Sequence, residues 1–154
     1  MIPSSIIHLV YASVATKKFE RRELTELLEQ SRKANECNGL TGILLHSDGN
    51  FFQVLEGEPA IVDKLYRKLH LDPRHHQITQ IIREPIPKRY FADWSMGFSD
   101  VTTQELATID GLNDFFAGGS CFTQLGAGRG KKLLAAFANG RWRTAIAGST
   151  RTEE

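Results

Sequence analysis

The chain has 154 residues, of which 41% are hydrophobic and 24% charged, and its 19 Lys and Arg nearly balance 18 Asp and Glu. This composition is that of a globular protein and excludes disorder, collagen and a disulfide mini-scaffold. The length suits one domain with a short extension, and a net charge of +1 argues against a dedicated nucleic-acid binder. Cys37 and Cys121 make neither a disulfide framework nor a zinc site. With no membrane-length apolar run and no signal peptide, we expect a cytoplasmic protein without a membrane contact.

Seven elements are predicted in the first hundred residues from strand alternation and helical spacing. The expected strands are 6–13, 40–46, 51–56, 77–84 and 94–99, and the expected helices are 20–36 and one that runs from Pro59 to Asp72-Pro73. Pro85 and Pro87 are expected to break the fourth strand, and residues 74–76 to form a basic loop. The order β-α-β-β-α-β-β predicts an α+β, ferredoxin-like fold, with a five-stranded mixed sheet and two helices on one face.

The remaining residues differ in charge and in pattern. Residues 101–126 carry three acids and no base, whereas 127–154 carry six bases and two acids. Short helices are expected at 103–110 and 130–139, with a flexible glycine-rich linker at 126–130 between them. We therefore divide the chain into a domain at 1–100, a helical extension at 101–147 and a tail at 148–154. The extension is expected to cover the second face of the sheet, through Leu133, Leu134 and Phe137.

The sequence offers little for metal or nucleophilic chemistry. His75 and His76 are adjacent, His70 lies upstream, and none has a Cys or Glu partner at metal-binding spacing, so no metal site is expected. There is no nucleophile elbow, P-loop or dinucleotide fingerprint. Nothing near Cys37 suggests a reactive thiol.

Five side chains on inward-facing positions are unusual for a core: Tyr11, Asn35, Gln53, Trp94 and Met96. Buried amides need partners, at roughly 1–3 kcal/mol for each unsatisfied group. A polar core that satisfies itself and a slot for a flat heterocycle explain this set equally well. In the second case Leu27, Leu65 and Leu69 would form the walls and the amides the floor.

Five separated blocks resemble the BLUF family of flavin-binding blue-light photoreceptors. They are Val10-Tyr11-Ala12-Ser13, Asn35 with Gly39-Leu40-Thr41-Gly42, Gly49-Asn50-Phe51-Phe52-Gln53-Val54-Leu55-Glu56-Gly57, Asp72-Pro73-Arg74-His75-His76 and Trp94-Ser95-Met96. The resemblance covers residues 5–100 and implies the same element order.

The resemblance also implies non-covalent FAD between the two helices. Excited flavin would take an electron and then a proton from Tyr11 through Gln53, which would rearrange and shift the absorption band to the red. Trp94 and Met96 match a pair that reports the light state. The residues implied in cofactor binding are Leu27, Ser31, Asn35, Phe51, Gln53, Lys68, Leu69, Asp72, Arg74, His75 and His76. The sequence departs from the family pattern at two positions. Ala34 stands where a polar residue is common, so one contact to the ring would be lost or made by other groups. Lys68 stands where arginine is common, so its contact to the cofactor would be looser.

We therefore expect a photoreceptor rather than an enzyme, which signals through residues 101–140 to a separate effector or regulatory protein. A homo-oligomer is also compatible with the resemblance. Two alternatives stay open from the residues: a light-insensitive interaction module, and a small phosphate-ester hydrolase on the same scaffold.

Overall fold

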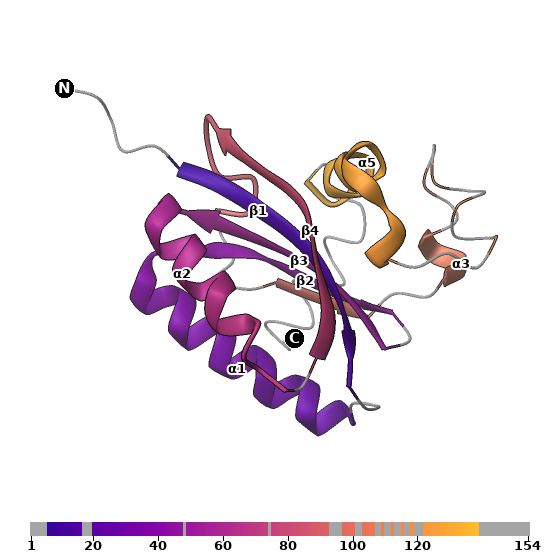
Figure 1. The fold of residues 1–154 in the computed structure, drawn as a ribbon, viewed down its shortest axis with the longest axis horizontal. Helices are drawn as coiled ribbons and strands as arrows, with labels where there is room; N and C mark the ends of the chain where they lie inside the picture. The colour runs from indigo at the N-terminus through magenta and orange to yellow at the C-terminus, as the bar shows by residue number, and fades with distance from the viewer. Residues whose placement is uncertain are drawn as a thin grey trace, which may run out of the picture.

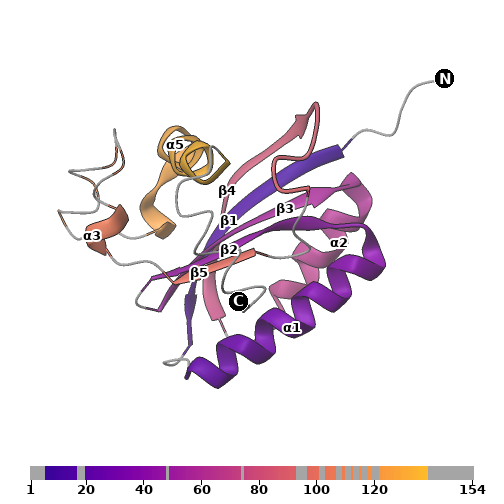
Figure 2. The same ribbon diagram turned by 180° about the vertical axis from the view of Figure 1, so that it is seen from behind.

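The protein is described here by a computed structural model. The structure describes residues 6–16, 20–47, 49–73, 75–92, 97–100, 103–106, 109, 112, 115, 118 and 122–138. The α+β class predicted from the sequence is confirmed. Two helices, α1 and α2, lie on one face of a twisted sheet, and α5 lies on the other (Figure 1). Figure 2 shows the same layers from behind.

The sheet is built from five strands in the order β4-β1-β3-β2-β5. Their bounds are Ile6–Ala15 (β1), Thr41–Ser47 (β2), Asn50–Gly57 (β3), His75–Ile86 (β4) and Gly97–Asp100 (β5). β1, β2, β3 and β4 pair antiparallel to their neighbours, whereas β5 joins β2 in parallel. β1 and β3 therefore occupy the middle of the sheet, where both faces can be covered.

The two predicted helices on the first face are confirmed. α1 spans Arg21–Asn38 and ends at Gly39, whose φ of 70° is the left-handed conformation that glycine adopts without strain. At its start the Glu20 backbone N–H donates to Glu23 Oε1 at 2.8 Å, so a free N–H is satisfied. α2 spans Pro59–Leu69 with its proline in the first turn, where the missing N–H costs nothing.

β4 is longer than predicted at both ends. The expected loop at His75 and His76 is wrong, because both residues belong to the strand, and Pro85 lies within it and pairs with Ile7. β4 is an edge strand, and an edge tolerates proline because one side of its backbone needs no partner. Two register shifts against β1 show bulges in β4, one of which inserts Ile81.

Alternation along the central strands divides the core into two clusters. On the helix side, Leu9 and Tyr11 join Leu24 and Leu28 of α1. On the other side lies a cluster built from Val10, Ala12, Ile43, Leu45, Phe52, Val54, Ile82, Phe91, Leu106, Ile109, Leu112, Phe122, Leu125, Leu133 and Leu134. Leu133 and Leu134 thus pack on the second face as predicted, whereas the Phe137 side chain lies outside the described residues.

The extension contains α3 (Thr103–Leu106), a short 3-10 helix η1 (Phe122–Gln124) and α5 (Gly126–Ala138). The predicted linker at 126–130 is wrong, because these glycines form the start of α5. Gly130 is buried, and a Cβ built there would lie 2.6 Å from Ile81 Cγ2. The absence of a side chain therefore lets α5 approach β4 closely, which outweighs the poor helix propensity of glycine.

A buried carboxylate holds the connection that leads from β4 towards β5. Glu56 of β3 is fully buried and accepts hydrogen bonds from Thr41 Oγ1 at 2.7 Å, the Tyr90 backbone N–H at 2.7 Å and the Phe91 N–H at 3.1 Å. Arg89 adds bonds to Thr41 Oγ1 and to the carbonyl of Glu56, both at 2.9 Å. Residues 89–91 are thereby fixed against β2 and β3.

Candidate functional site

A cavity of about 280 Å³ opens between α1, α2 and the helix-side face of the sheet. The residues that line it are Tyr11, Ser13, Leu27, Gln30, Ser31, Ala34, Asn35, Leu44, Phe51, Gln53, Leu65, Lys68, Leu69 and Asp72. Leucines come from both helices, and polar side chains come from the strands and from one side of α1. The cavity therefore combines apolar walls with a few hydrogen-bonding groups, as small-molecule sites do.

Tyr11 and Gln53 stand opposite each other on β1 and β3 and both face the cavity. The Tyr11 hydroxyl donates a hydrogen bond to Gln53 Oε1. Tyr11 is 1% exposed and Gln53 is 9% exposed, so water does not compete strongly for this bond. Burial raises the pKa of the Tyr11 hydroxyl well above its usual range, and nearby Tyr66 and Asp72 raise this pKa further. Tyr11 therefore remains a neutral hydrogen-bond donor.

Asn35 brings a second amide to the cavity from the last turn of α1. Its side chain is buried, at 1% exposure, at the position that the helical period assigns to the interior. Its backbone carbonyl accepts from the N–H groups of Gly39 and Leu40, so the end of the helix is fixed around it. Ser31 lies one turn earlier and also lines the cavity.

Charged groups lie at the end of the cavity formed by α2 and the turn after it. Lys68 is exposed and Asp72 is half-buried, and both line the cavity. Thr16 Oγ1 donates to the Pro73 carbonyl at 2.6 Å, which ties this turn to the end of β1. A cation and a carboxylate near solvent suit the polar end of an elongated ligand, because neither has to be buried.

Nine of the predicted site residues line the same cavity: Tyr11, Leu27, Ser31, Asn35, Phe51, Gln53, Lys68, Leu69 and Asp72. His76 does not, because it lies exposed on β4 beside Val14. Arg74, Trp94, Met96 and the side chain of His75 lie outside the described residues.

Three lining residues were not predicted: Ser13, Gln30 and Leu44. Ser13 follows Tyr11 by two residues, so strand alternation gives it the same face. Leu44 pairs with Gln53 across β2 and β3, a register that the hairpin alone could have supplied. Gln30 lies three residues after Leu27 on α1, within the same helical stripe.

Within the described residues, no three His, Cys, Asp or Glu side chains gather closely enough to hold a metal ion. No described helix combines the length and the apolar character that crossing a bilayer requires. The cavity is also without a histidine or a cysteine among its described lining residues. Its described polar groups are therefore a phenol, amides and hydroxyls, together with the charges of Lys68 and Asp72.

The fold and the cavity define a small α+β domain with a ligand slot between two helices and a sheet. The family model of BLUF, sensors of blue-light using FAD, matches residues 6–97. The chain belongs to the BLUF family. The match confirms the predicted resemblance to blue-light sensors of this family over residues 6–97.

Known proteins agree with the family assignment. The photoactivated adenylate cyclase subunit beta of Euglena gracilis is 33% identical over 112 residues, which are 72% of this chain and 13% of that protein. The dark-state structure of BlrB, a BLUF protein, superposes with a TM-score of 0.71 at 29% identity and covers 88% of this chain and 97% of that one. A structure of Klebsiella pneumoniae BlrP1 with FMN and cyclic diGMP gives a TM-score of 0.61 at 28% identity, over 90% of this chain and 36% of that one. The chain thus spans about an eighth of the cyclase subunit that it resembles.

Proposed function

We propose that this chain is a blue-light photoreceptor that binds FAD non-covalently in the cavity between α1 and α2. It senses light on a five-stranded, ferredoxin-like domain and signals through its C-terminal extension. The observation that carries this proposal is the buried hydrogen bond from Tyr11 to Gln53 at the cavity face of the central strands. Neither side chain is needed there for packing alone, since an apolar pair would fill the same space without polar atoms to satisfy.

The cavity suits a flavin ring in shape and in chemistry. Leu27, Leu65 and Leu69 offer apolar walls to the faces of a flat heterocycle, while Asn35 and Gln53 offer amide donors and acceptors to its polar edge. The volume of about 280 Å³ lies near the lower end of the roughly 300–1,000 Å³ that ligand sites usually occupy. The cavity would therefore hold the ring system, with Lys68 placed to meet the phosphate part of the cofactor near solvent.

Each polar residue then has a defined task. A bound flavin would supply the absorption of blue light and an electron acceptor. Tyr11 would donate an electron and its hydroxyl proton, with Gln53 as the path of the proton, and both would return to Tyr11 on recombination. Because Gln53 Oε1 accepts from Tyr11, its Nε2 is the donor end of the amide. Rotation or tautomerisation of this amide would exchange donor and acceptor, and the changed hydrogen bond to a bound ring would shift its absorption to the red.

We assign FAD rather than FMN because the family is described by FAD. The contacts that would discriminate FAD from FMN lie beyond the ring system, at the end of the cavity where Lys68 supplies a positive charge. Asp72, Arg74, His75 and His76 complete the proposed phosphate and ribityl region, and Trp94 and Met96 the light-reporting pair. As a point charge, Lys68 attracts phosphate without fixing its orientation.

The signal goes to a separate effector or regulatory protein through the extension. The cyclase and BlrP1 relatives show that related domains occur in much longer chains. A cytoplasmic location, the absence of nucleic-acid binding and a homo-oligomeric state remain predictions from the sequence.

The test is the absorption spectrum of the purified full chain, in the dark and after blue light, followed by the Tyr11→Phe variant. The parent is expected to show a flavin band that shifts to the red and recovers in darkness. Tyr11→Phe is expected to bind FAD and to lose the reversible shift. Titration with FAD, FMN and riboflavin then identifies the preferred flavin by its affinity.

Each result has a separate meaning for the proposal. A chain that takes up no flavin would overturn it and favour the interaction module. A reversible red shift that persists in Tyr11→Phe would remove Tyr11 from the assigned role. Equal affinity for FAD and riboflavin would contradict a phosphate contact beyond the ring.

A further inference from the structure

The pairing of β1 with β3 carries two rows of polar residues on opposite faces. Tyr11 pairs with Gln53 on the cavity side, and in the same register His8 pairs with Glu56 on the side of the extension. The rows are three residues apart, about 10 Å along the strands. A displacement of either strand at the cavity therefore reaches residues that face the extension.

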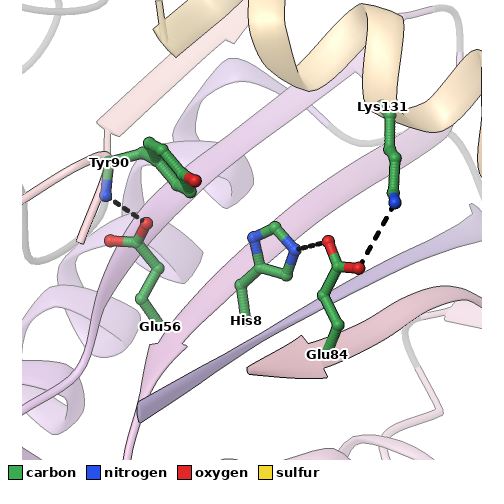
Figure 3. Close-up of polar contacts among 5 residues, drawn as sticks. All are labelled: His8, Glu56, Glu84, Tyr90 and Lys131. Atoms are coloured by element: carbon green, nitrogen blue, oxygen red, sulfur yellow. Dashed lines mark hydrogen bonds and ion pairs between the residues drawn. The ribbon is translucent and has the colours of Figure 1, made fainter. Parts of the chain in front are cut away.

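His8 is the buried centre of a chain of contacts that ends on α5. Its Nε2 lies 2.8 Å from Glu84 Oε2 on β4, and Glu84 Oε1 lies 3.3 Å from Lys131 Nζ on α5 (Figure 3). An ionised carboxylate can only accept, so Nε2 of His8 is the donor in this contact. The buried Nδ1 of His8 has no partner within the described chain. Among the described residues, Glu84 is thus the hydrogen-bond partner that holds His8, while the Tyr90 ring lies 6.1 Å away and Glu56 accepts from its own donors.

A second contact joins β4 and α5. The bulge in β4 falls between the partners of Val10 and Tyr11, and its extra residue is Ile81. Ile81 packs against the buried Gly130 of α5, the residue immediately before Lys131. The irregularity beside Tyr11 and the ion pair beside His8 therefore meet α5 at consecutive residues.

We propose that His8, Glu84 and Lys131, together with the Ile81–Gly130 contact, form the joint through which the state of the cavity sets the attachment of α5 to the sheet. His8 acts as a positioning residue: it does not line the cavity, and it fixes the carboxylate that Lys131 binds. This inference rests on the proposed photoreceptor function and names the route by which its signal leaves the domain.

The geometry explains why an exposed ion pair matters here. The Lys131 and Glu84 side chains are 57% and 36% exposed, and such pairs usually contribute little. In this case the hydrogen bond from His8, more than the charge of Lys131, lowers the pKa of Glu84, so the carboxylate is both ionised and held in place. A small shift of β1 would move His8 and with it the carboxylate of Glu84, to which Lys131 is paired.

The experiment compares Lys131→Gln with Lys132→Gln in the full chain loaded with FAD. Both lysines are exposed on α5, but only Lys131 has an ion pair among the described residues. Amide hydrogen exchange of residues 126–138 is measured in darkness and under blue light, with the red shift recorded on the same samples. Lys131→Gln is expected to retain the red shift and to reduce the light–dark difference in exchange about two- to fivefold. Lys132→Gln should match the parent, and Lys131→Arg should restore it.

Three results would count against the joint or against its premise. The joint is refuted if Lys131→Gln and Lys132→Gln behave alike, or if the parent shifts to the red without any change in the exchange of α5. A parent without a red shift defeats the proposed photoreceptor instead. In that case the amide hydrogen exchange of residues 126–138 is compared with and without bound FAD. Equal differences in Lys131→Gln and Lys132→Gln would then refute the joint independently of light.

Discussion

At the scale of single residues, the buried phenol of Tyr11 explains why the site is a neutral hydrogen-bond network. Its hydroxyl donates a hydrogen bond to Gln53 in place of water. Removing the hydroxyl proton would leave a negative charge in an apolar setting near Asp72. The folded state therefore favours the protonated phenol strongly. Photochemistry that begins from Tyr11 would thus begin from a neutral donor at neutral pH.

This raised pKa predicts how the stability depends on alkaline pH. Because the folded protein holds the Tyr11 proton more tightly than the unfolded chain, the associated stability is present below pH 10 and is lost as the pH rises. Between pH 10 and 11 the parent is expected to lose roughly 1 kcal/mol more than Tyr11→Phe. Urea unfolding of both proteins measures this, with their difference at pH 8 as the baseline. Parallel losses would show that Tyr11 ionises as readily in the fold as in the unfolded chain.

The polar residues of the cavity were predictable because two simple periods locate them. Alternation gives Tyr11 and Gln53 one face, and the helical repeat turns Asn35 inward. His8, Glu56 and Glu84 were not singled out, because their meaning depends on cross-strand partners that the alternation does not supply. A histidine between two acids becomes visible only when β1 lies between β3 and β4.

At the scale of elements, the sequence located helices and strands better than their ends. The errors at the end of β4 and at the start of α5 have one origin, since both arise from residues that break regular structure. Pro85 is tolerated because β4 is an edge strand. Gly130 belongs to a helix because a larger side chain at this position would collide with Ile81 of β4. Tertiary contacts decided both cases, and neither contact is encoded within the segment itself.

The packing of α5 on β4 predicts opposite effects for two glycines of the same helix. Gly130→Ala places a methyl group 2.6 Å from Ile81 Cγ2, and such overpacking usually costs about 1–3 kcal/mol. At Gly128 a Cβ would meet nothing within 4 Å, so Gly128→Ala should be neutral or should stabilise by up to about 1 kcal/mol through helix propensity. Urea midpoints of the two variants test this. Equal stabilities would mean that α5 does not pack closely on β4.

At the scale of the whole molecule, one sheet serves two cores with different tasks. The helix side holds the cavity, and the opposite side is apolar and covered by the extension. Phe122 of η1 illustrates this second core: it is buried against Phe52 of β3, with ring centroids 5.6 Å apart. The sequence predicted a cover for this face but not its extent, because residues 103–125 show little regular pattern.

This second core predicts that residues 1–100 do not fold stably by themselves. The extension supplies seven buried apolar side chains to it: Leu106, Ile109, Leu112, Phe122, Leu125, Leu133 and Leu134. At about 1.5–3 kcal/mol each, their loss amounts to on the order of 10 kcal/mol, which is comparable to the whole stability of a typical domain.

A chain ending at residue 100 is therefore expected to unfold without a cooperative transition or to aggregate, as seen by circular dichroism and sedimentation. A chain ending at residue 147, which removes only the predicted tail, should unfold like the parent. A cooperatively folded, monomeric 1–100 fragment would contradict the argument, since an apolar sheet face exposed to water would then be stable. A folded dimer of that fragment would support it, because a second copy would replace the missing cover.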